Sequence, residues 1–297
     1  MNRYLAPLLL PLLACAVFAQ DPAKAQEPKK PGKLADWPTL KQPDQDRVAA
    51  LAGQFRKPDA NLQKSAGEQL AAIGDGAVPI LFRQVSDRDE ALNALLFGLF
   101  DKMLGPQHAA LMARESKTNK PALRRYLVLR MCKLTDPDLE PVLQAATKDK
   151  DEDIAFFAQV GLLGLRKTAA LAPVLDRART NWSDIQPLVS QVLPAARSEA
   201  MGRATAETIG NAQPPAQAAA LRLFRYLGTK EQGALIRHHL QAKDFNVKKE
   251  AINAMRAIHG EEPIENLSVF NATKMAKEDR KSTRLNSSHA NISYAVF

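Results

Sequence analysis

The sequence predicts an all-α protein, an α-solenoid of about seven two-helix repeats with a 31-residue period. An apolar residue followed by a turn recurs at steps of 30 or 31 residues. Further apolar residues precede each of these positions at helical spacing, and sustained alternation typical of strands is absent. A fixed period of this size indicates supersecondary units that bury their apolar faces against one another. The recurring positions are Ile73, Leu104, Leu134, Leu165, Ala196, Leu227 and Ile258.

The first helix of each unit is predicted from apolar residues 3, 7 and 11 positions before the recurring residue. These spacings place the side chains on one stripe of a helix, so each first helix is expected to run about twelve residues up to that position. The second unit departs from the pattern with Asn93 and Asp101, and its bulk shifts to Phe100.

A turn and a second helix complete each unit. In the first unit, Gly74-Asp-Gly76 is expected to end one helix, because glycine reaches the positive φ of a helix C-terminus, and Pro79 to open the next. Charged links such as Asp87–Glu90 and Lys148–Asp153 are expected to be solvent-facing loops between units.

The N-terminal residues are predicted to lie outside the repeats. Residues 1–19 resemble a secretory signal, with Arg3, a short apolar core and small residues before a cut after Ala19. Alternatively, Leu12–Cys15 resembles a lipobox, and Cys15 would then carry lipid. Both alternatives predict export to the periplasm or the medium, with membrane attachment only through Cys15.

Residues 20–45 are rich in proline and lysine and are predicted to form a disordered or extended linker. Trp37 lies in this linker, and the sequence leaves open whether it docks on the first repeat. The solenoid is assigned to residues 46–278, beginning with a single capping helix that carries Val48, Leu51 and Phe55.

The C-terminal residues 279–297 resemble a translated sequencing-library adaptor. The adaptor frame that starts GAT-CGG-AAG-AGC gives Asp279-Arg-Lys-Ser and continues in register to Phe297, apart from a barcode at 290–291. We therefore interpret this tail as non-native, and we expect that the natural chain continues differently after Glu278.

Composition constrains the function only weakly. The formal charge of +9 falls to +6 once the leader's Arg3 and the tail's net +2 are removed, and this modest excess argues against nucleic acid as a partner. After cleavage at Ala19 only Cys132 remains, so no internal disulfide is expected.

No catalytic, cofactor or metal site is predicted. The sequence has no P-loop, dinucleotide fingerprint, zinc motif or nucleophile elbow. His238 and His239 are adjacent on a helix and diverge too far to chelate one ion. One candidate partner-binding feature, here called the arginine stripe, occupies the same register of four second helices. Its members are Arg83, Arg114, Gln144 and Arg237. Arginine pairs well with carboxylates and phosphates, although a solvated helix face is the simpler explanation of the stripe.

The repeats resemble HEAT repeats, most closely the short bacterial form named after phycobilin lyases. The best match is Gly74–Leu81, which contains Val-Pro-Ile-Leu. Two later segments, Leu139–Leu143 and Leu171–Leu175, repeat the proline and the leucine of this motif as Pro-Val-Leu. This resemblance covers about residues 47–275, is weakest at Ala196–Gly202, and implies a right-handed solenoid whose concave face binds other proteins. It supplies no catalytic residues.

Together these observations predict an exported, monomeric HEAT-repeat scaffold that binds an unidentified protein and is not an enzyme. Two alternatives remain at this point. One is an enzyme or enzyme subunit of the HEAT-like lyase type, and the other is a binder of anionic surfaces.

Overall fold

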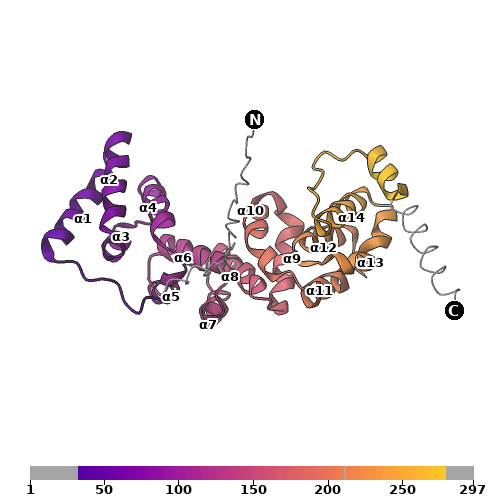
Figure 1. Ribbon diagram of the computed structural model, residues 1–297, viewed down its shortest axis with the longest axis horizontal. Coiled ribbons are helices and arrows are strands. Elements are labelled where there is room, and N and C mark those ends of the chain that lie inside the picture. The colour runs from indigo at the N-terminus through magenta and orange to yellow at the C-terminus, as the bar shows by residue number, and fades with distance from the viewer. Residues whose placement is uncertain (1–32, 211, 279–297) are drawn as a thin grey trace, which may run out of the picture. The chain divides into compact units, whose positions relative to one another are not determined.

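The computed structural model describes residues 33–210 and 212–278, and every regular element in these ranges is helical (Figure 1). The prediction of an all-α protein is therefore confirmed for this part of the chain. The leader with Cys15, the first half of the linker and the adaptor-like tail lie outside the described residues. Of the helices that are described, none is long and apolar enough to cross a membrane.

The first described helix, α1 (Gln42–Gln54), packs against α2 and α3 through Val48, Leu51 and Ala52. It has no side-chain cap at its start, but a proline lies in its first turn, where a missing N–H costs nothing. Helix α1 thus covers the apolar face of the first hairpin.

First and second helices then alternate along the chain, and in most units the first helix is the longer one. The first helices are α2 (Ala60–Ile73), α4 (Glu90–Met103), α6 (Pro121–Leu134), α8 (Glu152–Gly164), α10 (Trp182–Val192), α12 (Pro214–Leu227) and α14 (Phe245–Ile258). Several begin with an aspartate whose side chain accepts an N–H of the first turn, as Asp59, Asp89, Asp151 and Asp244 do.

Each second helix follows a tight 3-10 turn. The helices and their turns are η1 (Asp75–Ala77) with α3 (Val78–Gln84), η2 (Pro106–His108) with α5 (Ala109–Glu115), η3 (Pro137–Leu139) with α7 (Glu140–Ala146), η4 (Thr168–Ala170) with α9 (Leu171–Thr180), η5 (Leu193–Ala196) with α11 (Glu199–Ile209), and η6 (Lys230–Gln232) with α13 (Gly233–Ile236) and η7 (Arg237–Gln241). Gly74 ends α2 at φ 80°, as expected from its lack of a Cβ atom.

The fifth unit differs from the expectation. Its first helix ends at Val192, and the recurring Ala196 falls in the 3-10 turn η5 instead of closing an α-helix. Pro194 lies in η5, where its missing N–H and its ring both oppose α-helical continuation, although α10 accommodates Pro187 in its interior.

The exceptions of the second unit also have physical explanations. Asn93 is buried but satisfied, because it accepts the N–H of Ser86 at 3.0 Å and donates to the Ser86 carbonyl at 2.6 Å. Asp101 points to solvent and accepts the hydroxyl of Tyr126 at 3.0 Å, while Phe100 fills the core in its place.

The apolar core falls into two clusters that share α12. Ala219, Leu223 and Leu227 belong to the cluster that extends back to the N-terminal hairpins, whereas Leu221 and Phe224 belong to the one packed with α14. A helix with apolar residues on two faces can join successive layers in this way.

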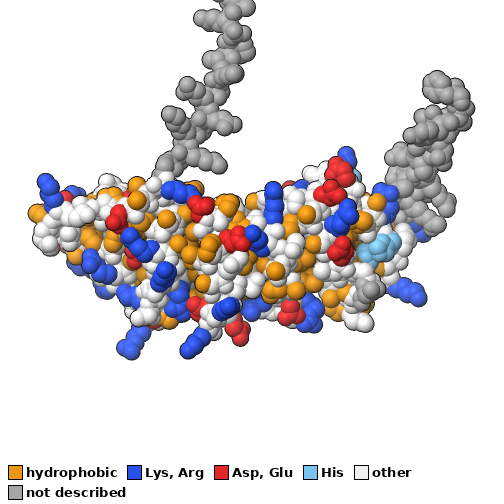
Figure 2. Space-filling view, turned by 90° about the horizontal axis from the view of Figure 1, so that it is seen from below, with side chains coloured by type: hydrophobic (Ala, Val, Ile, Leu, Met, Phe, Trp, Pro, Cys, Tyr) orange, Lys and Arg blue, Asp and Glu red, His pale blue; other side chains and the backbone are white. Residues whose placement is uncertain are grey.

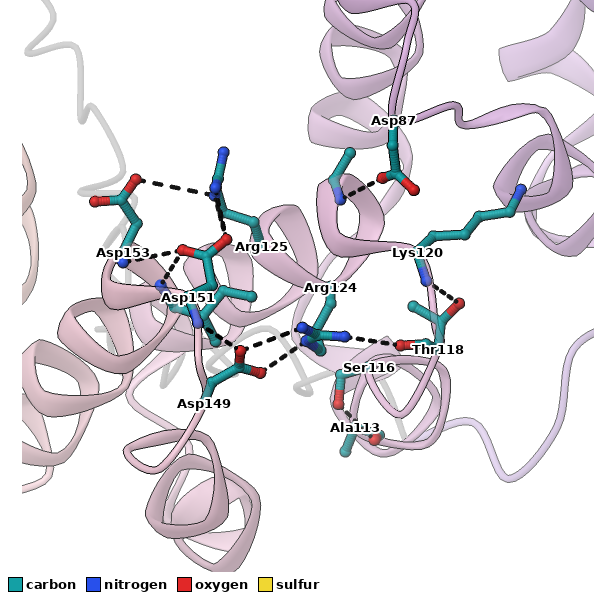
Figure 3. A network of polar contacts seen from close by, with 12 residues as sticks. Asp87, Ala113, Ser116, Thr118, Lys120, Arg124, Arg125, Asp149, Asp151 and Asp153 are labelled. Atoms are coloured by element: carbon teal, nitrogen blue, oxygen red, sulfur yellow. Dashed lines mark hydrogen bonds and ion pairs between the residues drawn. The ribbon is translucent and has the colours of Figure 1, made fainter.

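Polar side chains join consecutive hairpins through the links between them (Figure 3). Lys120 reaches the carbonyls of Arg83 and Val85 at 2.7 and 2.8 Å, where it complements the C-terminal dipole of α3. Asp87 accepts the N–H of Ala122 at 2.9 Å and so supplies the cap that α6 lacks. These contacts fix one hairpin against the next.

Candidate functional site: the Trp37 groove

The segment of residues 33–41, here called the strap, is extended and lies across the second helices of the first hairpins. In Figure 1 it is the indigo coil that runs from beside α5 to the start of α1. Pro38 disfavours helix in the residue before it, and the strap carries few apolar side chains. The chain is therefore held in place by a few specific contacts rather than by secondary structure.

Trp37 is the anchor of the strap, with 9% of its surface exposed. Its indole stacks on the His108 ring at a centroid distance of 5.5 Å and an angle of 18°, and meets the edge of Phe82 at 6.0 Å. The indole Nε1–H donates to Glu115 Oε1 at 3.3 Å. The site thus satisfies both the apolar body and the polar edge of a tryptophan. We call this site, between α3 and α5, the Trp37 groove.

The floor of the groove is a buried histidine with a fixed orientation. His108 Nδ1 accepts the Gly105 N–H at 3.0 Å, and Nε2 lies 3.1 Å from Asp75 Oδ2. Because Nδ1 is an acceptor, the ring proton resides on Nε2, facing the carboxylate. His108 has no exposed surface, so the ring presents a rigid face to the indole.

A charged pair lies beside the indole. Arg114 donates to Asp36 Oδ1 at 3.0 Å, and its Nε lies 3.5 Å from Glu115. The hydrogen bond from Arg114, with a smaller contribution from the Trp37 N–H, lowers the pKa of Asp36, and Asp36 raises the pKa of Arg114. Arg114 therefore links the strap's carboxylate to the carboxylate that holds the indole.

Two further contacts extend the strap over neighbouring hairpins. Leu34 donates its N–H to the Gln107 carbonyl at 2.9 Å, and Lys33 pairs with Asp138 and, at 2.9 Å, with Asp136. Burial opposes ionisation of Asp136, but the hydrogen bonds from Lys33 and the Asp138 N–H leave its pKa below the ordinary value.

At its other end the strap passes close to the first turn. A Cβ atom on Gly76 would lie 2.7 Å from Leu40 Cδ2 and 3.0 Å from the Pro38 carbonyl oxygen. Glycine at this position therefore leaves the space through which the strap crosses η1. The strap as a whole therefore contacts three successive hairpins, whereas the Trp37 groove itself is formed by two of them.

The arginine stripe is distributed over second helices as its register implies. Arg83 is exposed on α3, Gln144 is exposed on α7 and donates to Glu140, and Arg237 begins η7. Arg114 contacts the strap through Asp36. On the face seen in Figure 2, basic side chains are interspersed with acidic ones.

Sequence reasoning left the docking of Trp37 open and did not single out Phe82, His108 or Glu115. The available signal was the isolated tryptophan after an acidic residue in a segment otherwise poor in apolar side chains. Its partners are far along the chain, 78 residues away in the case of Glu115, so no local pattern indicated them.

Another hollow lies on the first-helix face, between α4, α6 and α8. It measures about 510 Å³ and is lined by Phe97, Tyr126, Leu129 and Phe157, with Asp87 and Arg125 at its rim. Phe97 and Tyr126 stack at 4.5 Å. Within the described ranges no three His, Cys, Asp or Glu residues gather closely enough to hold a metal ion.

Comparison with known proteins gives likeness in fold only. No family model and no curated protein matches the chain. Human deoxyhypusine hydroxylase, solved in complex with glycerol, is 15% identical, with 72% of this chain and 85% of that chain covered and a TM-score of 0.34. An engineered protein is 13% identical, with 72% and 98% covered and a TM-score of 0.28. The all-helical architecture is consistent with HEAT-like repeats.

These comparisons correct one prediction. The sequence was interpreted as that of a protein that is not an enzyme, yet an enzyme is among the solved structures that the chain is similar to. An all-helical fold of this kind therefore gives no ground for excluding catalysis. At a TM-score of 0.34 the likeness assigns no reaction to this chain either.

Proposed function

We propose that this protein is an exported HEAT-repeat scaffold whose second-helix face binds an extended segment of another protein. The fold we propose is a right-handed solenoid of about seven two-helix repeats with a 31-residue period. Support comes from the first helices, which begin at Ala60, Glu90, Pro121, Glu152, Trp182, Pro214 and Phe245, at steps of 30 to 32 residues.

The observation that carries the proposal is the strap itself. An extended piece of chain lies across second helices and is held by an aromatic anchor, an ion pair and a backbone hydrogen bond. These are the kinds of contact by which a protein groove holds a peptide without pairing it into secondary structure. A surface that accepts such a segment in the same chain has the chemistry to accept one from a partner.

Export and a monomeric state remain part of the proposal. The supporting residues, 1–19 with Cys15, lie outside the described part of the chain, and lipidation at Cys15 would place the scaffold at a membrane surface. The interspersed charges of the second-helix face favour a protein partner over a uniformly anionic polymer.

Site-specific photo-crosslinking in the source organism tests this function. A photoreactive amino acid replaces Arg83, which is exposed on the second-helix face, or, as the matched control, Lys102, which is exposed on first helix α4. We expect a discrete cross-linked partner from position 83 and none from position 102. Cross-links from position 102 alone, or from neither position, would refute a second-helix binding face.

A further inference from the structure

We infer that the Trp37 groove recognises a partner segment in which an acidic residue directly precedes a tryptophan, and that the strap competes with this segment. The inference rests on the proposed function and specifies the partner's chemistry. The strap supplies the pattern, because Asp36 and Trp37 occupy two adjoining subsites.

The indole subsite is specific for tryptophan. Glu115 accepts the indole N–H, while Phe82 and His108 contact the ring. A phenylalanine would fill part of the same space but would leave the carboxylate of Glu115 without this donor. A site built to hydrogen-bond a ligand group discriminates strongly against ligands that lack it.

The acidic subsite lies one residue earlier in the segment. Arg114 is half-exposed and pairs with Asp36 at 3.0 Å. A lysine at this position of a ligand would face the guanidinium and repel it.

The contacts of the strap make it exchangeable. Trp37 is its single buried side chain, whereas Ala35, Asp36, Pro38 and Thr39 are exposed. Segments with few buried contacts open locally without global unfolding. Because the strap is covalently attached, its effective concentration is on the order of millimolar, so a free segment competes poorly until the strap is weakened.

Binding of a labelled peptide with the sequence of residues 33–41 to the full chain tests the inference. Fluorescence anisotropy is measured for the wild type, for Trp37→Ala and for Asp36→Lys, the last being a change at an exposed position that leaves the core intact. We expect both variants to bind the peptide at least about 10-fold more tightly than the wild type, because their own strap no longer occupies the groove. Equal binding to all three chains, or no binding to either variant, would overturn the inference.

Two peptide variants test the subsites. A peptide with Trp37→Phe is expected to bind the Asp36→Lys chain about 10-fold more weakly than the original peptide, because Glu115 loses its donor. A peptide with Asp36→Lys is expected to bind weakly to the Trp37→Ala chain, and an Arg114→Asp substitution in the Trp37→Ala chain, whose strap lacks its anchor, is expected to restore its binding. Unchanged affinity for both peptides would show that the groove binds any extended chain and would overturn the stated recognition pattern.

Sedimentation of the wild type and of Trp37→Ala separates the possible occupants. We expect monomers in both, whereas a dimer that Trp37→Ala dissolves would identify the strap of a second copy as the occupant and overturn the partner assignment. The photo-crosslinking result is independent of these measurements. Cross-links from position 83 without peptide binding would end this inference alone, and peptide binding without such cross-links would end the proposed function.

Discussion

Replacing Glu250 with glutamine is expected to destabilise the junction between α12 and α14. Glu250 pairs with buried Arg225 and, at 3.1 Å, with Arg222, and its own side chain is 7% exposed. Burial lowers the pKa of both arginines, which shows that their charges depend on a compensating partner. Glutamine keeps the shape but removes the carboxylate that both guanidinium groups contact, and Arg225 retains only the weaker influence of Glu265.

The magnitude follows from the different burial of the two arginines. Removing one partner of a buried ion pair costs roughly 3–5 kcal/mol. Arg225 is 4% exposed and bears the full cost, whereas Arg222 is 23% exposed and also lies 5.5 Å from the Trp182 ring centre, where the aromatic face partly compensates its charge. We therefore expect a loss of about 3 kcal/mol in the free energy of unfolding.

Urea unfolding followed by circular dichroism measures this loss. Glu199→Gln is the matched control, because its pair with Arg203 is exposed on both sides and is expected to contribute less than about 0.5 kcal/mol. A loss below about 1 kcal/mol for Glu250→Gln would refute the reasoning that the cluster depends on its single carboxylate.

Three further predictions concern the strap, a histidine and the thiol. Gly76→Ala is expected to displace Leu40 and to speed hydrogen exchange of the strap. The control is Gly98→Ala, where no atom lies within 4 Å of the added Cβ and where α4 is expected to gain about 0.5–1 kcal/mol of stability. Equal hydrogen exchange of the strap in both variants would contradict the close approach of Gly76 to Leu40. Burial and, less, His238 lower the pKa of His239 to about 4. As the pH falls, this histidine is therefore protonated in the unfolded chain before it is protonated in the folded one. The free energy of unfolding is expected to decrease by up to about 3 kcal/mol between pH 6.5 and pH 4, and this decrease should be absent in His239→Gln. Cys132 is fully buried and its pKa is raised to about 12, so the thiol is expected to resist a disulfide reagent at pH 8 until urea unfolds the chain; rapid labelling of the folded protein would show that the helix pair α6–α8 opens locally.

Local sequence patterns predicted the helices and much of the core. Leu70, Leu127 and Phe224 lie at the predicted stripe positions and are fully buried, because a helix with a 3.6-residue repeat turns those positions to one side. Gly74 was expected to end a helix and does so at positive φ. The prediction failed at the end of the fifth first helix, which stops at Val192 and leaves Ala196 in the 3-10 turn η5.

The groove could not be predicted in the same way. Phe82, His108 and Glu115 come from two hairpins, and their alignment under Trp37 depends on how those hairpins stack. The sequence indicated Arg114 as a binding residue through its register, but the carboxylate that it holds is 78 residues earlier.

The sequence by itself determined that the chain is helical, where most helices end and which side chains are buried in the core, because these properties follow from spacings of a few residues. Only the tertiary structure decided that Gly76 lies under the strap, that His108 forms the floor for Trp37, and that Glu250 joins two arginines. Contacts between residues dozens of positions apart depend on the packing of whole hairpins, and no short-range pattern encodes that packing.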